Sequence, residues 1–99
     1  MFLFVIIAKP KPNNDDFRKF KGAYVKAYIN FKDELGAELL ARHYIDDIGW
    51  VFEKIDKVSW LTEKEAKKEE DVYKAFIMAN ENGRSLVFHA WSKDLKLKH

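Results

Sequence analysis

The sequence predicts an α+β fold, a two-layer sandwich in which two helices pack on a four-stranded sheet. Three observations predict it. Residues 2–8 are apolar at every position, which is typical of a strand that is buried on both faces. Residues 22–31 alternate between apolar and polar side chains, which is the pattern of a strand with one buried face. Residues 33–48 carry apolar side chains at the three- and four-residue spacing of a helix.

The composition is that of one small folded domain, which we assign to residues 1–99. The chain has no cysteine, which excludes disulfides, thiolate nucleophiles and cysteine metal sites. Its apolar start is too short for a membrane span, which needs about 20 residues. No signal-peptide cleavage site follows it. We therefore expect a cytoplasmic protein that does not enter the membrane, with residues 93–99 as a frayed basic tail.

The connection between the first two strands, residues 9–21, is long for a small domain. Asn14 or Asp15 can cap a single helical turn there, and Phe17 and Phe20 would pin that turn to the core. A mobile hairpin loop is the alternative. The helix over 33–48 can be capped by Asn30 or Asp33, and Gly49 is placed to end it.

The second half of the chain predicts a strand, a helix and a last strand. Residues 50–61 form the strand, with a bulge near Asp56 that returns Val58 and Trp60 to one face. Two short strands around a turn are the alternative. Residues 62–80 form the helix, which Thr62 and Glu65 start as a capping box. Residues 84–92 form the last strand.

The predicted order is β-β-α-β-α-β. The architecture is ferredoxin-like in size and layering, although the order departs from the usual βαββαβ of that fold. Because crossovers are right-handed, we expect both helices on the same face of the sheet. The strand over 2–8 is apolar on both faces. Its second face then needs another cover, which could be a second copy, a partner protein, the 9–21 loop or the charged part of the second helix.

The uncovered face of the sheet is our candidate site. Tyrosine and tryptophan are typical of protein interfaces, and two-fold pairing is the commonest oligomer. We therefore expect a non-enzymatic interaction module that pairs with itself, as a sheet-to-sheet homodimer, or with another protein through this face. The residues that alternation places there are Tyr24, Lys26, Tyr28, Asn30, His89 and Trp91, with Trp60 as a further candidate.

Two other functions are open. Aromatic rings beside Lys26 are a recipe for binding single-stranded nucleic acid, although the net charge of +2 is low for that purpose. A small-ligand site or an enzyme would use His89, or His43 with Asp46 and Asp47. The sequence contains no nucleophile motif, phosphate-binding loop or metal-binding spacing. We expect no catalytic residues, metal or cofactor.

Overall fold

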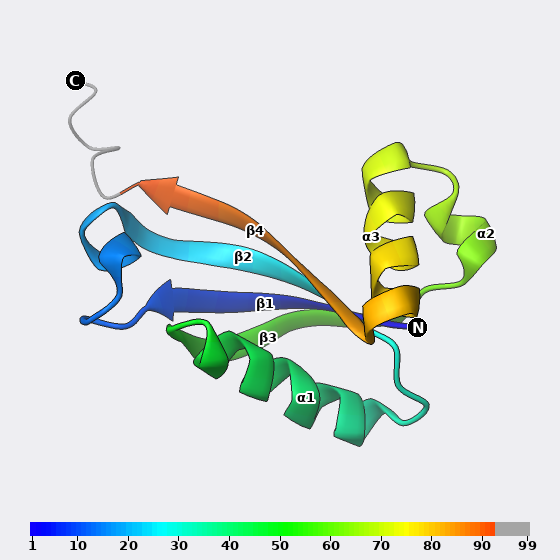
Figure 1. Ribbon diagram of the computed structural model, residues 1–99, viewed down its shortest axis with the longest axis horizontal. Helices are drawn as coiled ribbons and strands as arrows, with labels where there is room; N and C mark the ends of the chain where they lie inside the picture. Colours follow the sequence, from blue (N-terminus) through cyan, green and yellow to red (C-terminus); the bar gives the residue numbers. More distant parts are fainter. Residues whose placement is uncertain (93–99) are drawn as a thin grey trace.

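The computed structural model describes residues 1–92, and the tail expected over 93–99 lies outside the described residues. Figure 1 shows the arrangement of the elements. In the described part, no helix is long and apolar enough to cross a membrane. In chain order, the elements are β1 (Phe2–Pro10), the 3₁₀ turn η1 (Asp15–Arg18), β2 (Phe20–Ile29), α1 (Glu34–Asp47), β3 (Trp50–Trp60), α2 (Glu63–Ala66), α3 (Glu70–Asn82) and β4 (Arg84–Ser92).

The four strands form one sheet in the order β3-β1-β2-β4, and every neighbouring pair is antiparallel. The predicted α+β class is therefore confirmed, with β1 at the centre of the sheet. The predicted bulge in β3 is confirmed as well, because the register with β1 shifts between the partners of Val5 and Ile6, where Asp56 is the extra residue. A second shift in β3 leaves Glu53 as the extra residue.

The two faces of the sheet carry separate buried clusters. We call one the α1 face: Phe4, Ile6 and Ala8 of β1 pack there with Ala41 and Ile45 of α1. We call the other the α3 face, and it carries the alternate β1 residues. Its buried cluster contains Met1, Tyr28, Ala66, Ala75, Phe76 and Ala79, with Leu3, Leu61, Val72, Tyr73 and Val87 packed against them.

The expectation that both helices lie on one face is therefore wrong. The two clusters use alternate residues of the same strands, and alternate side chains of a strand point to opposite faces. The right-handed crossover rule applies to parallel strands. It constrains the β2–α1–β3 connection, since both of these strands run antiparallel to β1. It does not constrain the connection from β3 to β4, because these two strands are antiparallel to each other. The helices of that connection can therefore lie on the opposite face, and the layering departs from a ferredoxin-like sandwich.

The single helix expected over 62–80 is also wrong, because it is divided into α2 and α3. The capping box at its start is present, with Thr62 Oγ1 accepting from Glu65 N at 3.2 Å. In one continuous helix, Ala66 would lie about 130° around the axis from the stripe centred on Val72, Ala75, Phe76 and Ala79. The break at 67–69 lets Ala66 and that stripe both face the core, where Ala66 is completely buried.

Candidate interaction face

Within residues 1–92, the α3 face of the sheet is covered over only one half. Tyr28 and Val87 pack with α3 at the end of the sheet where β4 begins. Figure 1 shows α3 standing over this end, and no helix of the described part of the chain lies over the other end of the same face. Val5 and Ile7 of the central strand point to this face but are only partly buried, and neither belongs to the two buried clusters of the described residues. We call the uncovered part the open half. It comprises Val5, Ile7, Tyr24, Lys26, Lys54, Lys57, His89 and Trp91.

One side of the open half is aromatic. The Tyr24 side chain is 44% exposed, and its ring centroid lies 5.4 Å from that of Trp91 at an interplanar angle of 56°. A β-carbon added to Gly22 would lie 2.7 Å from Cζ2 of Trp91, so this glycine makes room for the indole. His89 pairs with Tyr24 in the ladder between β2 and β4 and is exposed.

The other side of the open half is basic. Lys54 of β3 lies opposite Ile7, and Lys57 lies opposite Val5. On the other side of Val5, its partner in β2 is Lys26. Directly paired residues in an antiparallel sheet share a face, so these lysines surround the two aliphatic side chains.

The border between the open half and α3 is a cavity of about 350 Å³. Lys26 and His89 line its sheet side, while Glu69 and Asp71 line its helix side. Burial raises the pKa of Tyr28 at its floor, and the negative charge of Glu69 raises that pKa further. The covered half therefore presents carboxylates toward a basic open half.

Four of the six residues predicted for the interaction face gather in the open half: Tyr24, Lys26, His89 and Trp91. Tyr28 is instead buried under α3, with only 2% of its surface exposed. Asn30 is exposed beyond the end of β2, where its backbone N donates to the oxygen of Gly83 at 2.9 Å.

Trp60, the further candidate, lies opposite Phe2, and its ring packs edge-on against Phe2 at 4.8 Å. Since Phe2 packs with the α1-face cluster, Trp60 belongs to that face.

The sequence predicts that the second face of residues 2–8 needs a cover, but it does not single out Val5 and Ile7. Of the basic residues it indicates Lys26 and neither Lys54 nor Lys57. Val5 and Ile7 sit in an unbroken apolar stretch, which predicts complete burial. Lys54 and Lys57 sit in a strand whose alternation is interrupted twice. Their face depends on the positions of both bulges, and the sequence signalled only the one near Asp56.

Within the described residues, His43 makes no hydrogen bond or ion pair with the acidic residues that follow it. It is exposed on α1, and its ring lies 5.7 Å from that of Tyr44. Asp46 instead bonds to Lys11, with 2.6 Å between Oδ1 and Nζ. The hydrogen bond and the charge of Lys11 lower the pKa of Asp46, and the charge of His43 also contributes to lowering it. Among residues 1–92, no cluster of three or more His, Asp or Glu side chains could hold a metal ion.

Comparisons with models of protein families, with curated protein sequences and with solved structures each found no significant match.

Proposed function

We propose that this protein is a non-enzymatic interaction module that binds a partner protein through the open half of its α3 face. The observation that carries the proposal is the partial exposure of Val5 and Ile7 at the centre of the sheet. Covering apolar surface is favourable by roughly 25 cal/mol per Å². A partner that covers these two side chains and the neighbouring Tyr24 ring would gain that energy.

The chemistry of the partner follows from the lysines. Lys26, Lys54 and Lys57 stand around the aliphatic centre, so a matching surface carries apolar side chains surrounded by Asp or Glu. A second copy of the same face is a poor match, because it would bring these lysines against their counterparts. We therefore assign the open half to an acidic partner protein rather than to the sheet-to-sheet homodimer.

Single-stranded nucleic acid is the second candidate, and the exposed Tyr24 ring beside Lys26 favours it. Base stacking requires accessible ring faces. Trp91 is partly buried and packs over Gly22 and beside Tyr24, which limits the stacking surface. The aliphatic centre of the open half suits protein side chains better.

A ligand site or an active site at His89 has less support. In a catalytic histidine, a hydrogen bond between the imidazole ring and a second group sets the orientation of the ring. Within residues 1–92, His89 has no hydrogen bond or ion pair to orient its imidazole, although the cavity it lines would admit a small molecule.

Fluorescently labelled probes test the proposal by anisotropy. They are a short peptide of alternating Glu and Leu, the same peptide with Lys in place of Glu, and single-stranded oligo-dT. We expect the acidic peptide to bind, added salt to weaken it, and the basic peptide not to bind. Lys57→Glu should weaken binding of the acidic peptide about tenfold. Lys32→Glu, the matched charge reversal outside the sheet, should leave the affinity nearly unchanged.

Two results would overturn the proposal. Equal effects of Lys57→Glu and Lys32→Glu would show that net charge, rather than this face, attracts the peptide. Binding of oligo-dT without binding of the acidic peptide would show that the protein binds single-stranded nucleic acid instead of an acidic partner protein.

A further inference from the structure

The two edges of the sheet differ in how they are protected. At the β3 edge, two bulges interrupt the strand, and it carries Glu53, Lys54, Asp56 and Lys57. Bulges and charges are the usual means by which proteins prevent an edge strand from pairing with another chain. Within residues 84–92, β4 is less protected, since Arg84 at its start is its one strongly charged residue. It pairs with β2 without a register shift from Arg84 to Ala90, and its apolar residues outnumber its charged ones.

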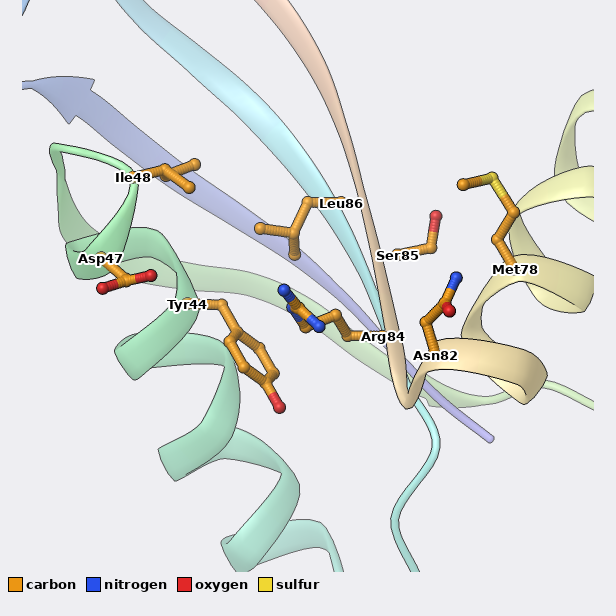
Figure 2. Close-up of a pocket in the computed structure, with 8 residues that line it drawn as sticks. All are labelled: Tyr44, Asp47, Ile48, Met78, Asn82, Arg84, Ser85 and Leu86. Carbon is orange, nitrogen blue, oxygen red and sulfur yellow. The ribbon is translucent and has the colours of Figure 1, made fainter.

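The β4 edge lies in a cleft that leaves room for another strand. A cavity of about 540 Å³ runs between α1 and α3, with Tyr44 and Ile48 on one side and Met78 and Asn82 on the other. Figure 2 shows Arg84 and Leu86 extending from β4 toward α1, while Ser85 lies on the side of α3. The two helices flank the start of β4.

A second cavity continues the cleft along the α1 face. It measures about 420 Å³ and shares Ile48 with the first. Phe88 and Ala90 of β4 line it, together with Asp16 beyond the far end of the strand. The accessible groove therefore follows β4 for most of its length. Its wall is mixed beside Arg84 and Ser85 and mainly apolar beside Phe88 and Ala90.

We infer that β4 pairs with β4 of a second copy of this chain, antiparallel about a two-fold axis, so that the two sheets become one. Backbone hydrogen bonds between the two edges would supply most of the specificity, as in other strand additions. Phe88 lies at the middle of β4, so a pairing centred there places each Leu86 opposite Ala90 of the partner subunit. These side chains meet in the apolar groove.

The charges at the ends of the groove favour a second copy over an unrelated extended peptide. On the α1 face, Arg84 stands at the start of β4, with its guanidinium 4.6 Å from the Tyr44 ring centroid. Asp16 lies at the opposite end, beside Ala90. Two-fold antiparallel pairing brings each Arg84 next to Asp16 of the partner subunit, twice per dimer. Parallel pairing would bring the two Arg84 residues together instead.

This dimer also places the two proposed binding faces on the same side of the joined sheet, a consequence that rests on the proposed function. Tyr24, His89 and Trp91 lie on β2 and β4, at the side of the open half next to the β4 edge. Antiparallel pairing centred on Phe88 places each Trp91 opposite Ser85 of the partner subunit. Each open half therefore lies beside the end of the partner subunit that α3 covers, and the two open halves stand at opposite ends of the paired strands. A partner with two acidic segments could then bind both copies.

Sedimentation velocity of the full chain over a range of concentrations tests the inference. We expect a reversible dimer. Hydrogen exchange should show slow exchange for successive β4 amides, including those that point away from β2. Ala90→Lys, which places a charge in the groove, should shift the protein to monomer. The control Ser59→Lys introduces the same side chain on the β3 edge and should leave the dimer intact, and circular dichroism should confirm that both variants fold.

A charge exchange identifies the orientation. Arg84→Asp and Asp16→Arg should each weaken the dimer about tenfold, and the double variant should recover most of that loss. A monomer at every concentration, or a dimer broken by Ser59→Lys and not by Ala90→Lys, would overturn the inference. The acidic-peptide titration gives an independent result, since a monomer can still bind the peptide and a dimer can fail to bind it.

Discussion

The indole of Trp91 packs directly over Gly22, where any β-carbon would lie 2.7 Å from its Cζ2 atom. This contact holds the Trp91 ring beside Tyr24 on the open half. A glycine in a strand interior has a cost, since it adds no packing and loses more backbone entropy than other residues. Here the absence of a β-carbon at Gly22 leaves the space that the Trp91 indole occupies.

Gly22→Ala should displace the Trp91 indole from its place beside Tyr24. The added methyl group overlaps the ring, so we expect a destabilisation of about 1–3 kcal/mol and weaker binding of the acidic peptide. In a proton–nitrogen NMR spectrum, the indole N–H signal of Trp91 should shift. The signal of Trp60, which lies on the other face at the opposite edge, should stay in place. An unshifted Trp91 signal would contradict this description of the aromatic side.

Asn14 anchors the loop between β1 and β2 to the end of α1. Its Nδ2 donates to the oxygens of Gly49 (2.9 Å) and Ile48 (3.3 Å), and its Oδ1 accepts from Asp16 N (2.8 Å). Asn14→Asp keeps the acceptor but places a carboxylate against two carbonyl oxygens. We expect a loss of about 1–3 kcal/mol in urea unfolding. Asn13→Asp, the exposed neighbouring change, should cost much less, and equal losses would contradict the anchoring role.

Tyr28 should make the protein sensitive to alkaline pH. Burial and the charge of Glu69 raise its pKa in the folded state, so the unfolded chain, with a tyrosine pKa of about 10, releases this proton first. The stability that this group contributes is present below pH of about 10 and is lost as the pH rises toward the raised folded pKa. Tyr28→Phe should flatten the fall of unfolding free energy in this range. Tyr24→Phe is the control on an exposed ring, and a slope that Tyr28→Phe leaves unchanged would contradict this assignment.

The ends of elements were the most predictable part of the fold, because they depend on a few neighbouring residues. Asp33 caps α1 by accepting from Gly36 N at 2.8 Å. Gly49 follows α1 with a φ of 87°, a conformation that glycine adopts at little cost. Asn14 caps the short turn η1, and it is one of the two residues, Asn14 or Asp15, that the sequence predicts as its cap.

The placement of helices on faces could not be predicted in the same way. Tyr28 and Ile29 are neighbours in β2, yet they belong to different clusters. Which helix covers which of them depends on the path of the long β3–β4 connection, and no local pattern in the sequence determines that path. Alternation alone therefore predicts that Tyr28 lies on an open face, whereas α3 covers it.

Alternation within a strand predicts which side chains of that strand share a face, and this predicts part of the candidate site. Tyr24 and Lys26 share a face because they are two residues apart in one strand. Lys57 joins them only through the pairing of β3 with Val5, which depends on where the chain bulges. The sequence therefore indicates the aromatic residues and Lys26, and only the three-dimensional register adds Lys54 and Lys57.

Amide chemical-shift mapping with the peptide of alternating Glu and Leu tests the central claim most directly. The account predicts saturable shifts at Val5, Ile7, Tyr24 and Lys57, with small changes on α1. Shifts confined to α1 and the groove beside it, or no saturable shifts at low salt, would contradict the assignment of the open half as the binding surface.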